Sequence, residues 1–155
     1  SSKTDLQKAS LDDFYPHDKA RYQARGGHGL FSTASDYSKF AEMLLDGKDT
    51  YGKPMLSKVM LDFVLKNRLK YDQIPIMIDE VPHCGYGWNL LGRIMVNSNE
   101  SLIAGNNGEF GWSGAASTYF WVDPTLKVTG VLMTQVLGST APIGENFRAT
   151  SYTCL

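Results

Sequence analysis

The chain has 155 residues, of which 43% are hydrophobic and 20% charged, a composition that is typical of a globular protein and excludes a disordered one. The 15 Lys and Arg nearly balance the 16 Asp and Glu, giving a net charge of −1, and no basic stripe with interleaved aromatics predicts nucleic-acid binding. No apolar run approaches the ~20 residues of a membrane span. We therefore expect no nucleic-acid partner and no membrane span. The two cysteines are expected to be free thiols, and the compartment stays open.

The chain begins with a polar stretch, and we expect an irregular segment at residues 1–25 followed by a domain at residues 26–155. A glycine loop at residues 26–29 opens the domain. Thr33 and Asp36 then resemble a capping box, and Gly47 is a plausible end of the helix that follows. The apolar stripe of this helix is Tyr37, Phe40, Ala41, Leu44 and Leu45.

A second helix is predicted at about Lys58–Lys66, with Ser57 as its N-cap. We expect it to bury Val59, Met60, Phe63 and Val64. Residues 67–82 fit no single pattern. Gly85–Asn97 is predicted to be one strand and Ser101–Ala104 a second, shorter one.

The most strand-like part of the chain is Ala115–Val136, which predicts two strands, Ala115–Val122 and Leu126–Val136. Asp123 and Pro124 between them favour a tight turn. Both strands are apolar on both faces, which predicts the middle of a sheet with helices on either side. A C-terminal helix is expected at Glu145–Leu155. The predicted fold class is therefore α+β, an antiparallel sheet flanked by helices. Because this chain offers few helices to cover such a sheet, we infer that a further portion completes the core.

The residues by themselves offer little sign of catalytic chemistry. Gly111–Ala115 comes near the nucleophile elbow G-x-S-x-G around Ser113, but Ala115 replaces the last glycine and a strand, rather than a helix, follows. The three histidines have no zinc-ligand spacing, so we expect no metal and no cofactor.

Two stretches together resemble a known family. Residues 26–37 read GGHGLFSTASDY and are followed by Met43-Leu44-Leu45, and residues 108–135 begin GEFGWSGAASTYFWVDP and end GVLMTQ. Both are similar to segments of the serine hydrolases related to class C β-lactamases. The likeness is to the family VIII carboxylesterase and penicillin-binding-protein-like branch. It implies the C-terminal portion of the β-lactamase and transpeptidase-like fold.

The resemblance also assigns roles to residues. Members of this family use a Ser-x-x-Lys, a Tyr-x-Asn and a third motif that opens the strand bordering the site. The third motif corresponds to Trp112-Ser113-Gly114, and Ala115 would offer a backbone N–H to the oxyanion. His28 would line the acyl pocket. Since Trp112 replaces the motif's lysine, which binds carboxylates, the resemblance implies a small neutral ester or amide as substrate.

The other two motifs, which carry the nucleophile, do not occur in this chain. It therefore contains no catalytic residue, and we expect it to be inactive alone and to need the N-terminal part of the same hydrolase as its partner. Self-association through the incomplete sheet is a second expectation. The alternative function is a non-catalytic remnant or binding module that retains the pocket fold.

Overall fold

The computed structural model describes residues 7, 8 and 30–155. His28 and nearly all of the irregular segment expected at residues 1–25 lie outside the described residues. Thr33–Leu155 forms a compact unit of its own.

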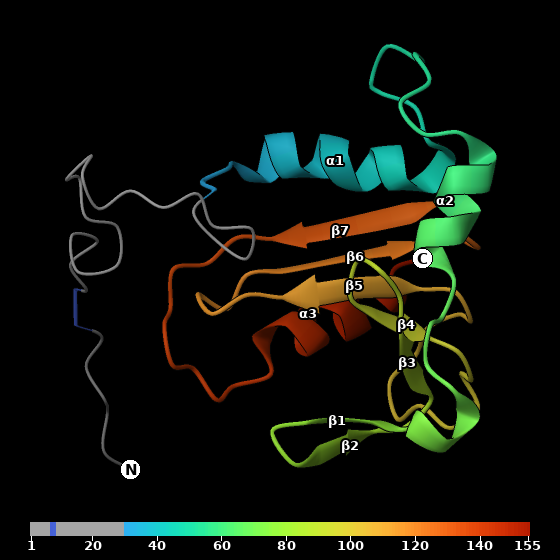
Figure 1. Ribbon diagram of the computed structural model, residues 1–155. Coiled ribbons are helices and arrows are strands. Elements are labelled where there is room, and N and C mark those ends of the chain that lie inside the picture. The colour runs from blue at the N-terminus through green and yellow to red at the C-terminus, as the bar shows by residue number, and fades with distance from the viewer. Residues whose placement is uncertain (1–6, 9–29) are drawn as a thin grey trace, which may run out of the picture. The chain divides into compact units, whose positions relative to one another are not determined.

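The centre of this unit is an antiparallel sheet with the strand order β3-β4-β5-β6-β7 (Figure 1). The strands are β3 (Tyr86–Trp88), β4 (Arg93–Met95), β5 (Phe110–Ser113), β6 (Tyr119–Asp123) and β7 (Val128–Leu132). Each pairs with the next along the chain, so the sheet is a meander. In the β6–β7 turn, Asp123 Oδ1 accepts the N–H groups of Thr125 (2.9 Å) and Leu126 (3.1 Å), which confirms the predicted turn.

Helix α1 (Ala34–Asp46) packs on β6 and β7. Thr33 Oγ1 accepts the N–H of Asp36 (3.1 Å), and at the other end Gly47 has a φ of 79° and donates its N–H to Met43 (2.8 Å). Both ends are therefore where the sequence predicts them. Alternate β6 residues Phe120 and Val122 join the core beneath α1.

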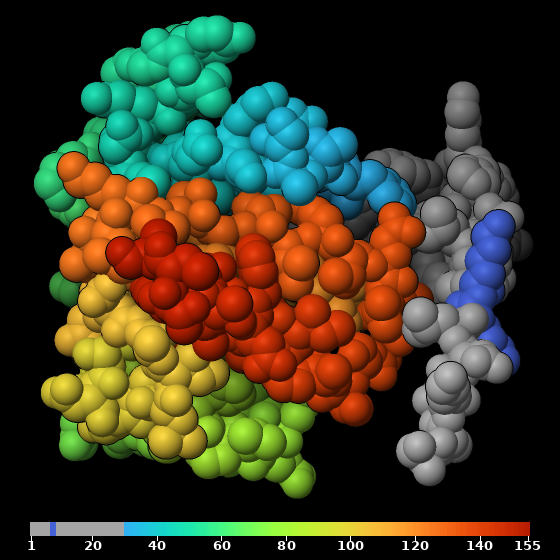
Figure 2. Space-filling view, turned by 180° about the vertical axis from the view of Figure 1, so that it is seen from behind, coloured from blue at the N-terminus to red at the C-terminus, as the bar shows by residue number. Residues whose placement is uncertain are grey.

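Helix α3 (Ile143–Tyr152) covers the opposite face of the sheet. Figure 2 shows this face, with the red residues of α3 lying across the orange strands. The remaining β6 residues point this way, since Trp121 packs edge-on against Phe147 at 5.3 Å between ring centroids. All five residues of β6 are buried, which confirms for this strand the predicted cover on both faces. The same prediction is wrong for the second strand, because β7 lies at the edge of the sheet and most of its residues are only partly buried. The structure is α+β, as predicted.

A smaller sheet pairs β1 (Ile76–Ile78) with β2 (Val81–His83), next to β3. It follows the 3-10 helix η2 (Tyr71–Gln73) and occupies the stretch whose pattern was ambiguous. Cys84 and Cys154 are exposed free thiols, as expected.

The expected strand Gly85–Asn97 is wrong, because β3 and β4 are separate and paired with each other. The side chain of Asn89 accepts the N–H groups of Leu91 (2.7 Å) and Gly92 (2.9 Å), and Gly92 has a φ of 146°. These contacts stabilise a turn inside the apolar run.

Ser101–Ala104 is likewise not a strand. The Ser101 hydroxyl donates to Ile103 O (2.9 Å) and accepts from Ile103 N–H (3.2 Å). The Ser101 hydroxyl thus occupies the backbone groups of Ile103 that would otherwise bond to a neighbouring strand.

Helix α2 (Lys58–Leu65) begins at the predicted cap, where Ser57 Oγ accepts the N–H of Met60 (3.2 Å). Of the residues expected to be buried, Val64 packs against the core. Leu61, which was not expected, is the buried residue of the helix, and Leu65 packs beside it. Val59, Met60 and Phe63 are 80%, 47% and 52% exposed. The C-terminal helix also differs, since it ends at Tyr152 and leaves Leu155 exposed.

Candidate active site

The predicted third motif lies at the end of β5. Trp112 and Ser113 are its last two residues, paired with Phe120 and Tyr119 of β6, so the motif closes one strand instead of opening the next. Gly114 begins the turn to β6, with its N–H donated to Thr118 O (2.9 Å) and its carbonyl accepting the N–H of Ser117 (2.9 Å).

This β5–β6 turn is fixed from outside by the segment that follows β7. Ser117 Oγ donates to Val136 O (2.8 Å), and Ala116 O accepts from Val136 N–H (3.1 Å) and Thr134 Oγ1 (2.5 Å). Ser117 has a φ of 58°, a conformation that a non-glycine residue keeps only where surrounding bonds impose it. The turn therefore presents its backbone groups in a set geometry.

Ala115 is exposed in this turn, and among the residues that the structure describes its N–H donates no hydrogen bond. The last pair between β4 and β5 joins Arg93 and Gly111. The residues of β5 that follow Gly111 therefore have no β4 residue opposite them. An exposed amide without an internal partner is available to an acceptor outside this chain.

A hollow of about 130 Å³ lies beside the turn, on the face that α3 covers. Its lining includes Ser113, Gly114 and Thr118 from the turn and Ser139 and Glu145 from the region that leads into α3. The lining is rich in hydroxyl groups and contains one carboxylate.

Trp112 is 36% exposed, and its ring contacts that of Trp88 edge-on, with 4.6 Å between centroids and 72° between planes. Trp88 was not among the predicted site residues. No signal in the sequence could place it there, because β3 and β5 are not neighbours in the sheet.

A buried polar network supports the same strands from the α3 side. The fully buried Arg148 pairs with Glu109, just before β5, and donates to Tyr86 Oη (2.9 Å). Tyr152 Oη lies 2.8 Å from Glu109 Oε2 and 2.7 Å from Asp123 Oδ2. Burial raises the pKa of Glu109 above its usual value, although Arg148 opposes this shift.

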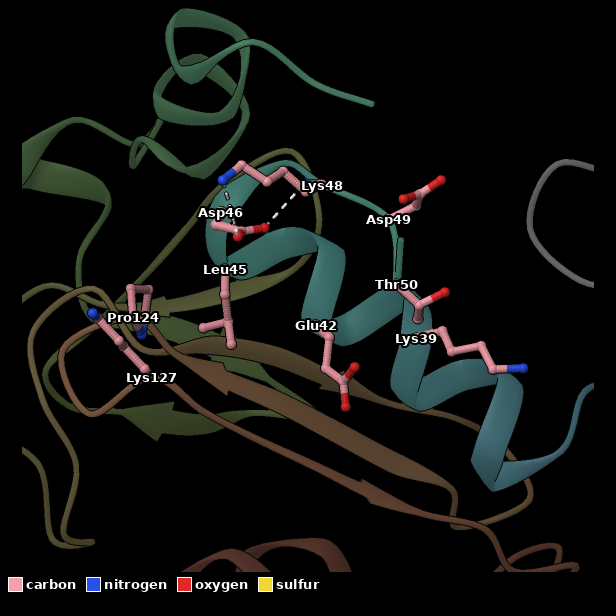
Figure 3. Close-up of a pocket in the computed structure, with 9 residues that line it drawn as sticks. All are labelled: Lys39, Glu42, Leu45, Asp46, Lys48, Asp49, Thr50, Pro124 and Lys127. Atoms are coloured by element: carbon pink, nitrogen blue, oxygen red, sulfur yellow. Dashed lines mark hydrogen bonds and ion pairs between the residues drawn. The ribbon is translucent and has the colours of Figure 1, made fainter. Parts of the chain in front are cut away.

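A larger hollow of about 390 Å³ lies elsewhere, where the end of α1 meets the β6–β7 turn (Figure 3). This turn is at the opposite end of β6 from the β5–β6 turn, so this hollow is not part of the candidate site. Its lining mixes both signs of charge and comprises Lys39, Glu42, Leu45, Asp46, Lys48, Asp49, Thr50, Pro124 and Lys127. Such a balanced lining selects no charged ligand.

Among residues 7, 8 and 30–155, no three His, Cys, Asp or Glu side chains are grouped so that they could hold a metal ion. In the same residues no helix combines the length and apolar character that crossing a membrane requires.

The structure thus brings four predicted site residues, Trp112 to Ala115, into one strand end and turn, while the fifth, His28, is outside the described residues. Ser113 is followed by a turn and then by strand β6, so the strand-turn-helix context of a nucleophile elbow is absent.

Comparisons with known proteins bear on the family and the fold. Two curated relatives, "Uncharacterized protein MT1414" and "Protein Rv1367c" from Mycobacterium tuberculosis strains CDC 1551 / Oshkosh and H37Rv, are each 31% identical over 114 residues. The match covers 71% of this chain and 28% of each relative. A solved structure, EstCE1, described as a hydrolase with promiscuous acyltransferase activity, is similar with a TM-score of 0.54 and 18% identity. That likeness covers 69% of this chain and 26% of EstCE1.

The meander with a helix on each face is an α+β domain of the β-lactamase and transpeptidase-like type. The chain belongs to the Beta-lactamase family, whose model matches residues 2–152. It spans about a quarter of the length of the proteins it matches, 28% of the curated relatives and 26% of EstCE1.

Proposed function

We propose that this chain is the C-terminal segment of a serine acyl hydrolase of the carboxylesterase branch, and that it supplies the third active-site motif and one oxyanion donor. The observation that carries the proposal is the N–H of Ala115, which lies in the exposed turn beyond the last β4–β5 pair and has no partner among the described residues. A tetrahedral oxyanion needs such donors held in a fixed geometry, and the bonded β5–β6 turn supplies it.

The substrate we propose is a small neutral ester or amide. The family resemblance places Trp112 at the position of the motif's lysine, which binds carboxylates, and the partly exposed indole offers an apolar surface in place of a charge. An apolar surface favours an uncharged group, because burying a carboxylate there without a partner costs free energy.

The Ser-x-x-Lys and Tyr-x-Asn would come from upstream sequence of the same protein, the partner proposed here. The 155-residue chain alone is expected to hydrolyse neither p-nitrophenyl butyrate nor nitrocefin. Joined to the upstream part of its reading frame, it is expected to hydrolyse the ester.

A fluorophosphonate probe tests the assignment of the nucleophile. The probe should label a serine of the upstream part and leave Ser113 unlabelled, as peptide mass spectrometry would show. Labelling of Ser113, or turnover by the chain alone that Ser113→Ala abolishes, would overturn the proposal and restore the elbow. A joined protein that folds but neither labels nor turns over would favour the non-catalytic remnant or binding module.

A further inference from the structure

The two tryptophans at the candidate site come from strands that do not pair. Between β3 and β5 lies β4, and Gly92 just before β4 carries no side chain. A Cβ added there would lie 3.2 Å from Trp112 Cβ and 2.9 Å from Gly111 O. The bare backbone of Gly92 therefore leaves the room in which the side chain of Trp112 approaches Trp88.

Trp88 is held firmly from the side of helix α2. Its N–H donates to Asn67 Oδ1 (3.0 Å) and its carbonyl accepts the N–H of Arg68 (2.7 Å), both in the loop after α2. The next residue, Asn89, is 1% exposed and closes the following turn with its side chain. The main chain of Trp88 is thus fixed on both sides.

The main chain of Trp112 is held in turn by its pairing with Phe120 of β6. Among the described residues, the ring of Trp112 makes one aromatic contact, the one with Trp88. The edge-on contact with Trp88 is the interaction that orients the Trp112 ring, and edge-to-face pairs at 4.5–7 Å are a favoured aromatic geometry.

We propose that Trp88 is a positioning residue that fixes the Trp112 indole beside the β5–β6 turn. Together the two rings, here called the indole wall, take a flat aryl group of the ester or amide in preference to a small alkyl group. The placement of that aryl group next to the reacting bond rests on the proposed function. The binding of an aryl group by the wall does not.

Binding can be tested on the chain as it exists, without turnover. Its three tryptophans give three indole N–H signals in ¹H–¹⁵N spectra. Titration with acetanilide, a stable aryl amide, should shift the Trp88 and Trp112 signals saturably, whereas N-methylacetamide should not. Trp121 is 1% exposed and serves as the internal control, since its signal should stay unchanged.

Trp88→Leu should weaken acetanilide binding by about 2- to 10-fold, the range that an aromatic pair contributes. It should also move the Trp112 signal in the free protein. Trp88→Phe keeps an aromatic ring and should recover most of the affinity. Leu90→Ala, an exposed neighbour on the same turn, should leave both properties unchanged. Equal signal shifts with acetanilide and N-methylacetamide would overturn the inference. So would a Trp88→Leu protein in which both the Trp112 signal and the affinity for acetanilide are unchanged.

Kinetics of the joined hydrolase separate this inference from the proposed function. Trp88→Leu should lower the ratio of kcat/KM for phenyl acetate to that for methyl acetate by about 2- to 10-fold. An unchanged ratio in an active enzyme overturns the positioning role. A joined protein that hydrolyses no ester, but whose wall still binds acetanilide, overturns the proposed function and supports the wall as an aryl-binding site.

Discussion

Gly114 is the residue at which the third motif turns away from β5. A Cβ added there would lie 2.5 Å from Thr118 Oγ1, so Gly114→Val should distort the turn that presents the N–H of Ala115. In the joined hydrolase we expect kcat to fall by roughly 10²–10³, the cost of one lost oxyanion donor. Steady-state kinetics with circular dichroism would measure the loss and show that the fold is kept.

A second variant tests whether the clash with Thr118 causes the effect of Gly114→Val. Thr118→Ala removes the hydroxyl that the new side chain would meet, so adding it to Gly114→Val should restore part of kcat. A folded Gly114→Val enzyme with unchanged kcat would show that the third motif lies elsewhere.

Gly130 illustrates a different constraint, imposed by packing alone. It pairs with Trp121 across β6 and β7, and an added Cβ would collide with the Trp121 ring. Because Trp121 is 1% exposed and packed against Phe147, the ring has little room to shift. Gly130→Ala should lower the free energy of unfolding by about 1–3 kcal/mol, the usual cost of overpacking a core.

Urea unfolding would measure that change. Leu126→Ala, at a 46% exposed position in the adjoining turn, is the control and should change stability by only about 0.5 kcal/mol. A Gly130→Ala protein as stable as this control would contradict the packing assigned to Trp121.

At the scale of elements, helix α3 is attached to the sheet through buried charges. Tyr152 has one hydroxyl proton but lies within hydrogen-bonding distance of both Glu109 and Asp123. With both carboxyl groups ionised, the hydroxyl can donate to only one of them. A proton on Glu109 would let it donate to the Tyr152 oxygen and complete the network.

Because Glu109 is buried in this network, the free energy of unfolding should depend on pH. Burial raises the pKa of Glu109 in the folded state above its usual value of 4.5, so the folded protein binds this proton more tightly than the unfolded one. Its contribution to stability is therefore fully present below the usual pKa and is lost as the pH rises through the raised one.

The substitution Glu109→Gln isolates the contribution of this proton to stability. Glutamine keeps an acceptor for Arg148 and a donor toward Tyr152 but cannot titrate. The difference in urea midpoint, wild type minus Glu109→Gln, should fall between pH 4 and 8. Hydrogen exchange of the α3 amides at both ends of that range would show whether this helix is the part that loosens. A difference that does not vary with pH would contradict the mechanism.

At the scale of the whole molecule, the feature that matters is the edge of the sheet at β7. Within the described residues β7 is the last strand of the sheet, and no strand pairs with its outer side. Helices pack on both faces of the sheet, and α2 exposes three apolar side chains, Val59, Met60 and Phe63. Leaving one such side chain in water forgoes about 1.5–3 kcal/mol, against a net domain stability of about 5–15 kcal/mol.

Open edges and apolar patches both favour association. We therefore expect the purified chain to self-associate, with light scattering showing a mass that rises with concentration. Adding the upstream part of the hydrolase should suppress this and protect the amides of Val128–Val136 from hydrogen exchange. A monomer in which those amides are already strongly protected would show that the unit is complete by itself.

The elements that the sequence determined by itself are those stabilised by nearby residues. Helix α1 begins and ends where predicted, because Thr33 bonds to a residue three positions on and Gly47 adopts a left-handed conformation. The start of α2 at Ser57 and the β6–β7 turn at Asp123 follow the same rule. The site residues Trp112 to Ala115 could be proposed together because they are consecutive in the chain.

Only the tertiary structure decided the features that join distant segments. The apolar run from residue 85 to residue 97 reads as one strand, until the buried Asn89 and the turn at Gly92 divide it. The pair of Trp88 and Trp112, and the contact of Arg148 with Glu109, connect residues with no shared local pattern. The N–H of Ala115 has no partner among the described residues, and the last pair between β4 and β5 joins Arg93 and Gly111. Strand pairing is a non-local property that no single stretch of sequence records.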